Sequence, residues 1–208
     1  MFIPEMKPRL NLVISKDNKI ISDTDVEAHS FVRNWYARCA SHGCFVNSRT
    51  AMNFGLIGTN GSSYVSDTNV MGRPYEVSYF IPGSGVTTFG LTVGNSDTAW
   101  AFTQYALSGL IAHGTGAGEL GYAAQSTTTK SDTDDTRTIT ISRVFNNTSG
   151  GDVTVREIGW GLNGWGGSSY SGYFMLFREV LDTPVVLTDA QQLTVNFMID
   201  LTYPETIS

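Results

Sequence analysis

The chain has 208 residues, 41 % hydrophobic and 12 % aromatic, which is enough for one large all-β domain with a substantial core. Only 15 % of the residues are charged, against about 25 % in typical domains, and Gly, Ser, Thr and Asn replace the missing charge. A net charge of −6 without a basic face argues against a nucleic-acid-binding protein, and no run approaches the ~20 apolar residues that span a bilayer.

Residues 1–23 are expected to form an extended N-terminal arm. Leu10, Leu12 and Ile14 recur at the two-residue period of a strand. The sequence KDNK at residues 16–19 is a turn signal, after which KIIS pairs back as a hairpin. The start of the chain lacks the pattern of a secretory signal, and two cysteines do not make a disulfide framework. We therefore expect a protein of a reducing cytoplasm.

Residues 24–43 are predicted to form a helix. Thr24 and Glu27 have the spacing of a capping box, and Gly43 suits the position after the last turn. Apolar side chains follow at helical spacing and would form one face: Ala28, Val32, Trp35, Tyr36 and Cys39.

Residues 44–208 are predicted to form a single β domain. Short apolar runs are separated by Gly, Ser and Thr at the spacing of an antiparallel β-sandwich or jelly roll. In TRTITISRVFNN and QLTVNFMIDLTY, apolar residues alternate with others, as in strands. VTVREIGW is expected to pair with the first of these across the NNTSGGD loop, and TDAQ has the length of a hairpin connection after PVVL. GYFMLFREV is apolar on both faces, which predicts a central strand.

The stretch IAHGTGAGELGY contains the spelling of a dinucleotide fingerprint at Gly116, Gly118 and Gly121. A fingerprint of this kind needs a helix after it, whereas YAAQSTTTKSDTDD has no helical stripe and is rich in hydroxyls. We therefore interpret the glycines as residues that permit positive φ in a compact loop, and expect no nucleotide cofactor.

Two groups of residues are candidates for a metal site. Cys39, His42 and Cys44 lie within six residues, but a structural zinc site usually has four ligands in two separated pairs. The acidic run SDTDD lacks the turn glycine and distal Glu of a calcium loop, so we expect a solvated loop with side chains Asp132, Asp134 and Asp135. No metal is predicted.

No nucleophile elbow, zinc-protease motif or phosphate-binding loop is present in the sequence. A glycosidase with two carboxylates stays open, because its acids can be far apart along the chain. The acids in aromatic-rich segments are Glu76, Glu157 and Glu179. The sequence favours a protein that is not an enzyme.

The stretch GWGLNGWGGSSYSGYF spaces four aromatic residues with glycines. Flat aromatic side chains on such a loop can stack on sugars or on a partner protein. The alternative is that Trp160 and Tyr173 end strands in the core and only the middle of the loop is exposed. Trp165 and Tyr170 are then the best candidates for exposed contact residues.

Three stretches together resemble a group of tailed-bacteriophage virion proteins: EAHSFVRNWY, YALSGLIAHGTGAGELGY and FREVLDTPVVLTDAQQLTVNFMIDLT. The likeness covers most of the chain from about Glu27 to Thr202, and it is one of pattern and order. It implies a structural component of the virion, assembled in the cytoplasm of a bacterial host, without cofactor or reaction.

Two roles in a particle are compatible with this resemblance. The first is a capsid decoration or cement protein, a homotrimer that bridges major capsid subunits. Its arm would add a strand to a neighbour through Leu10, Leu12 and Ile14, so that deletion of residues 1–22 would leave a folded domain but weaken assembly. The second is a tail or fibre component that binds host glycans through Trp165 and Tyr170. A glycan-cleaving enzyme is a remote third class.

Overall fold

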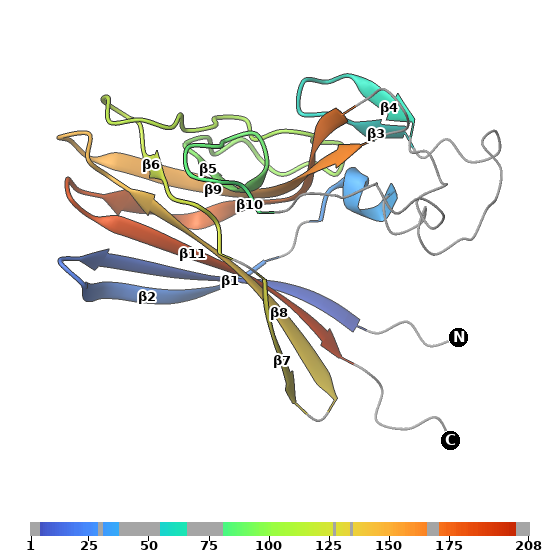
Figure 1. The fold of residues 1–208 in the computed structure, drawn as a ribbon, viewed down its shortest axis with the longest axis horizontal. Helices are drawn as coiled ribbons and strands as arrows, with labels where there is room; N and C mark the ends of the chain where they lie inside the picture. The colour runs from blue at the N-terminus through green and yellow to red at the C-terminus, as the bar shows by residue number, and fades with distance from the viewer. Residues whose placement is uncertain are drawn as a thin grey trace.

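The computed structural model describes residues 5–28, 31–37, 55–65, 81–126, 128–133, 135–165 and 171–202. These residues form eleven strands, all paired antiparallel, and a short helix at residues 33–37. Two sheets are stacked, with β5, β9 and β10 in one layer and β1, β2, β8 and β11 in the other (Figure 1). The predicted antiparallel, mainly β fold is confirmed, while the jelly-roll order does not follow from these strands.

The larger sheet has six strands. Its order is β2 (Lys19–Glu27), β1 (Glu5–Lys16), β11 (Gln192–Thr202), β8 (Thr136–Asn146) and β6 (Gly121–Tyr122), and β7 (Thr129–Thr133) also pairs with β8. The smaller sheet has the order β10 (Ser171–Leu187), β9 (Val153–Trp165) and β5 (Gly90–Gly94). A separate hairpin consists of β3 (Gly55–Ile57) and β4 (Ser63–Val65).

The core lies between the two sheets, and the strands of the larger sheet contribute every second side chain to it. Leu10 on β1 and Ile141 on β8 both lie opposite Phe197 on β11, and all three side chains are buried. Phe197 contacts the smaller sheet through Phe177 and Trp160, with ring centroids 4.7 and 5.3 Å away. Burial of each large apolar side chain of this kind contributes about 1.5–3 kcal/mol to stability.

The outer face of the larger sheet carries amides, hydroxyls and charges instead of apolar groups. Asn11 donates to Asp23 and Asp25 on β2, at 2.6 and 3.0 Å, and accepts a 2.8 Å bond from Asn196 on β11. The Ser142 hydroxyl on β8 donates to the Asn196 carbonyl oxygen. One row of hydrogen-bonded side chains thus crosses β2, β1, β11 and β8, and polar side chains make this face suitable for contact with water.

Two connections that looked like hairpins cross between the sheets. β8 and β9 are consecutive strands but lie in different sheets, and the same holds for β10 and β11. The expected pairing of VTVREIGW, which forms part of β9, with β8 is therefore wrong. The buried Asn147 joins the two crossings, because its amide donates to the carbonyl oxygens of Gly151 and Leu187, both at 2.7 Å. Short loops between strands therefore change layer here instead of reversing within one sheet.

The predicted hairpin at KDNK is confirmed, but the predicted arm is wrong. Asp17 and Asn18 have φ of 50° and 60°, as a tight hairpin turn requires, and β1 pairs with β2. β1 also pairs with β11 over its whole length, so it lies inside the sheet. Residues 5–27 thus contribute two strands to the sandwich, so the β domain begins before residue 44.

The predicted helix is wrong at its start. Thr24 and Glu27 lie on β2, opposite Leu12 and Arg9 of β1, because pairing along the sheet edge overrides the local capping signal. Helix is present only at residues 33–37 of the described part, and residues 38–43 lie outside it.

β10 is buried on both faces between Phe174 and Glu179, as its composition predicts, yet it is not the central strand of its sheet. Other segments cover its free edge: Val32 N–H donates to the Leu176 carbonyl at 3.0 Å, and Thr59 N–H donates to the Tyr173 carbonyl at 2.8 Å. The apolar sequence GYFMLFREV therefore reflects burial of the strand by irregular segments and not a central position in the sheet.

Candidate functional site

A long irregular segment, residues 95–111, covers the outer face of the smaller sheet. A buried ion pair anchors it: the Arg178 Nε of β10 donates to the Glu157 Oε2 of β9 at 2.6 Å, and both side chains are 0 % exposed. The other two nitrogens of Arg178 donate to the Gln104 Oε1 and the Thr98 carbonyl, each at 2.8 Å. The guanidinium therefore binds the segment and the sheet at once.

Glu157 anchors the far end of the same segment. Its Oε1 accepts a 2.6 Å hydrogen bond from the Gly109 N–H, and its Oε2 accepts one from Ser108 N–H at 3.3 Å. A backbone bond from Asn95 N–H to the Gly109 carbonyl, at 2.8 Å, closes the segment on itself. Both buried charges are thus compensated, and the segment is held in one position on the sheet.

The anchored segment exposes large apolar side chains. We define the aromatic loop surface as Trp100, Phe102, Tyr105 and Leu110, which are 41, 44, 41 and 47 % exposed, together with Tyr36 of the short helix at 54 %. The Phe102 and Tyr36 rings lie 5.7 Å apart. Exposed aromatic side chains on a fixed backbone are typical of a surface that contacts another molecule.

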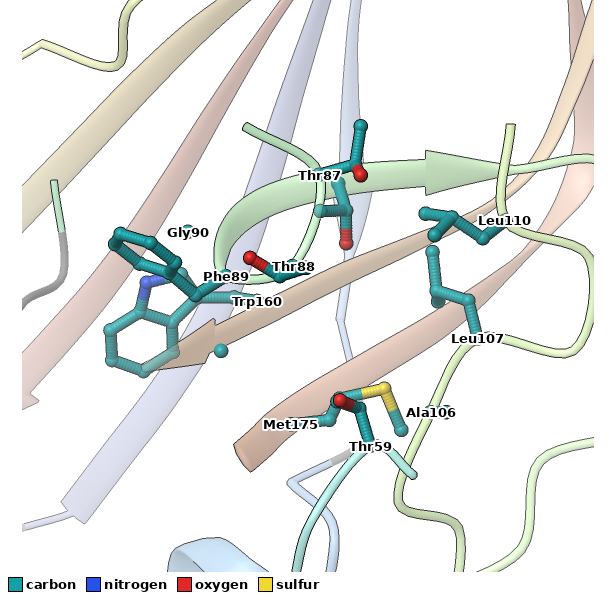
Figure 2. A pocket seen from close by; sticks show the side chains of 12 residues that line it. Thr59, Thr87, Thr88, Phe89, Gly90, Ala106, Leu107, Leu110, Trp160 and Met175 are labelled. Carbon is teal, nitrogen blue, oxygen red and sulfur yellow. The ribbon is translucent and has the colours of Figure 1, made fainter. Parts of the chain in front are cut away.

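A cavity of about 290 Å³ lies beside this segment, on the outer face of the smaller sheet. Threonines contribute its hydroxyl groups: Thr59, Thr87, Thr88 and Thr92. Apolar side chains form much of the rest, among them Phe89, Leu107, Leu110 and Met175. Figure 2 shows Thr87 and Thr88 facing Leu107 and Leu110 across the space, with Met175 and Thr59 along another side.

The floor of the cavity depends on glycines. Gly90 has a φ of 75°, and a Cβ there would collide with Pro82 and Gln125. At Gly161 a Cβ would lie 2.7 Å from the Phe174 carbonyl oxygen. A side chain at either position would collide with the surrounding protein, so only glycine fits there.

The larger sheet has a buried arginine of its own, Arg143 on β8, which binds carbonyl groups instead of a carboxylate. It donates to the carbonyl oxygens of Ala123 and Leu91, each at 2.8 Å, and of Gly83 at 3.1 Å. Its guanidinium lies 4.9 Å from the centre of the Tyr122 ring. Burial lowers the pKa of Arg143 to about 10 and raises the pKa of Tyr122 to about 12.

The predicted partner-binding residues of β1 do not lie on the surface. Leu10 and Leu12 are 0 and 4 % exposed and belong to the core, and Ile14 is partly buried against it. An available surface at these positions would require the sheet to open, so the predicted role in strand addition is wrong for this fold.

The stretch GWGLNGWGGSSYSGYF, which was predicted to expose aromatic side chains, includes the end of β9, the connection between the two strands and the start of β10. Trp165 is the last residue of β9, opposite Ser171, and Tyr170 lies outside the described residues, so neither exposure is tested. Trp160 is buried, as the alternative interpretation predicts, but Tyr173 is 39 % exposed and stacks on Phe89 at 5.9 Å. Sequence reasoning missed Tyr173 as a surface residue and missed the whole 95–111 segment.

The glycine-rich stretch is a compact loop, as interpreted from the sequence. Gly118 has a φ of 78°, and Gly121 lies in the short strand β6 instead of a helix. The Gly116 N–H, which an anion would need, donates to the chain's own Glu119 carboxylate at 2.8 Å. The His113 Nδ1 accepts from Tyr122 N–H at 3.0 Å.

The residues considered as metal ligands are only partly described. Cys39, His42, Cys44 and Asp134 lie outside the described residues. Asp132 accepts two hydrogen bonds from Arg137, the shorter at 2.6 Å, and this exposed pair closes the β7–β8 hairpin. Within the described ranges, no three His, Cys, Asp or Glu side chains gather as a metal site would require.

The three carboxylates named for a glycosidase are only partly described. Glu157 is enclosed with Arg178, Glu179 is buried at 8 % exposure, and Glu76 lies outside the described residues.

No helix in the described part has the length and apolar character needed to cross a membrane. Compared with protein-family models, curated proteins and solved structures, the chain matches none.

Proposed function

We propose that this chain is a non-enzymatic structural protein of a tailed-phage particle, where it acts as a decoration or cement protein. It bridges coat subunits and assembles with copies of itself as a homotrimer. The resemblance of three stretches of the sequence to virion proteins supports the class, and the low charge content suits a subunit surrounded by neighbours.

One observation carries the docking role. Arg178 and Glu157 are buried completely, and their hydrogen bonds fix the 95–111 segment on the sheet. That segment then exposes Trp100 and Phe102 to solvent. A surface of fixed aromatic side chains loses little conformational entropy when a partner covers it, which favours binding.

A second candidate is a tail or fibre component that binds a host glycan. The hydroxyl-lined cavity and the exposed Tyr173 beside Phe89 favour it, because both groups suit a sugar ring. The two candidates differ in where the chain sits in a particle. Antibody-labelled particles seen by negative stain are expected to carry the label on the head for a decoration protein and on the tail for the alternative.

The docking surface is tested with Trp100→Ser combined with Phe102→Ser. We expect the variant to keep its fold, since both side chains are exposed, and to lose most of its occupancy on particles, quantified by mass spectrometry. The matched control is Ile20→Ser with Ile21→Ser, two exposed apolar residues near the β1–β2 turn, which should keep full occupancy. Equal occupancy of both variants would exclude docking through the aromatic loop surface.

A further inference from the structure

The cavity on the smaller sheet has the chemistry of a small-molecule site. None of the described residues that line it has an ionisable side chain, since they are Thr, Gly and apolar or aromatic residues. Burial of a charged ligand without a counter-charge is costly, so the cavity selects a neutral one. The nearby charges, Arg178 and Glu157, are enclosed and engaged with each other and with the 95–111 segment.

The polar groups of the cavity converge from three segments. Thr59 follows β3, Thr87 and Thr88 precede β5, and Thr92 lies on β5. Thr92 donates to the Gly159 carbonyl at 3.4 Å. Within the part of the chain that the structure describes, the hydroxyls of Thr59, Thr87 and Thr88 make no hydrogen bond to protein. Each can both donate and accept, which matches a ligand that carries hydroxyls itself.

The apolar groups of the cavity lie opposite two of these hydroxyls. Leu107 and Leu110 face Thr87 and Thr88 across the space (Figure 2). A ligand that fits must therefore have an apolar face and a polar edge. Its volume is limited as well, because about 290 Å³ is at the lower end of the ~300–1,000 Å³ typical of ligand pockets.

We propose that the cavity binds one neutral pyranose ring. The C–H face of such a ring packs on the apolar wall, and its hydroxyls bond to Thr59, Thr87 and Thr88. Phe89 lines the cavity and stacks on Tyr173, which is 39 % exposed, so a second ring of a longer glycan has an aromatic platform beside the first. This inference holds wherever the chain sits in a particle, and it names the site that the glycan-binding alternative would use.

Saturation-transfer NMR on the full chain tests the proposal with four probes at millimolar concentration: the methyl glycosides of glucose, galactose, mannose and N-acetylglucosamine. We expect at least one to bind, and expect glucuronic acid, which is charged, to bind more weakly. Absence of binding by all four neutral probes, or tighter binding of glucuronic acid, would overturn the proposal.

Two variants locate the binding. Thr87→Val with Thr88→Val keeps the shape of both side chains but removes two hydroxyls, and we expect about tenfold weaker binding of the probe sugar. Ala106→Phe fills the cavity and should abolish binding. Thr129→Val, an exposed threonine on β7 away from the cavity, is the matched control and should bind normally. Thermal unfolding verifies that each variant is folded, and unchanged binding in both cavity variants would refute the site.

Two further comparisons separate the sources of such a ring. A trisaccharide of the bound sugar that binds more tightly than its methyl glycoside, and loses this gain in Tyr173→Ser, supports a glycan. Equal affinity of the two supports a free sugar, and either result agrees with the proposal. If Ala106→Phe abolishes particle occupancy while no sugar binds, the cavity receives a side chain of a neighbouring protein, which overturns the sugar site but leaves the docking role intact.

Discussion

The two sheets of the sandwich use their outer faces differently. The larger sheet leaves its outer face to water and covers it with its own polar side chains, such as Asn11, Asn196 and Ser142. The smaller sheet has part of its outer face covered by the 95–111 segment, which Arg178 and Glu157 hold in place. The first sheet is a scaffold, and the second carries the exposed aromatics and the cavity. Long irregular segments, more than strands, form the surface from which function is proposed.

Arg178 and Arg143, the two arginines that are buried in the described part of the chain, differ in their partners. Arg178 has a carboxylate partner, whereas Arg143 is satisfied by three carbonyl oxygens and two aromatic rings. Each nevertheless connects a strand to irregular segments far away in the sequence. A planar group with several fixed donors suits this task, because it can bind backbone from separate segments at one time.

Deletion of residues 1–22 is expected to have the largest effect on this arrangement. It removes β1, and with it Leu10 and Leu12, whose burial alone contributes about 3–6 kcal/mol at about 1.5–3 kcal/mol each. Since whole domains are stable by about 5–15 kcal/mol, we expect no cooperative thermal unfolding by circular dichroism. A truncated chain as stable as the full one would contradict the role of the larger sheet as scaffold.

Glu157→Gln should be the most damaging single change on the smaller sheet. It keeps the shape of the side chain but leaves the Arg178 charge buried without its partner, so the free energy of unfolding should fall by about 3–5 kcal/mol. Urea denaturation measures this change, and hydrogen exchange at Ser108 and Gly109 should rise as the segment loosens. The control Asp132→Asn breaks the exposed pair with Arg137 and should leave stability unchanged. Equal effects of the two variants would remove the distinction between the anchored and the solvated face.

The smallest expected effect concerns acid pH and the outer face of the larger sheet. Burial of Asp200 would raise its pKa, but hydrogen bonds from Arg9 and Thr138 and the charge of Arg9 outweigh it, so the pKa lies below its usual value. The unfolded chain then binds the proton more readily, so this stabilisation is present above about pH 4 and is lost as the pH falls further. Asp200→Asn should therefore flatten the acid side of a curve of stability against pH. An unchanged acid side would show that Arg9 does not hold Asp200 in solution.

Part of the scaffold could be predicted from the sequence, because the alternation in β8 and β11 and the β1–β2 turn are local signals, whereas the position of β1 inside the sheet is not. Leu193, Val195 and Phe197 alternate with polar residues, and the sequence KDNK indicates the turn at Asp17. The same alternation places Arg143 in phase with Ile141, so a charge facing the core was visible in the pattern. What failed was the choice of sheet for each strand, because a short loop reverses a chain within one layer or carries it to the next with similar residues.

The candidate site could not be predicted in the same way. Thr59, Thr88, Leu107 and Met175 meet at one cavity although they are tens of residues apart, and no local pattern connects them. The position of the 95–111 segment depends on Arg178. Its partners Gln104 and Thr98 are 74 and 80 residues away in the sequence, with several strands in between. Such contacts are decided by packing of the whole fold, to which a single sequence gives no direct access.

The pairing of β1 with β11 has a mechanical consequence. Glu5 lies opposite Thr202, so the first and last described residues lie at the same end of the larger sheet, on two adjacent strands. A pulling force applied through these two ends would separate the strands like a zipper, rupturing one small set of hydrogen bonds after another instead of shearing all of them together. The same geometry means that fluorescent or affinity tags fused to either end would sit side by side and mark one spot on any assembly.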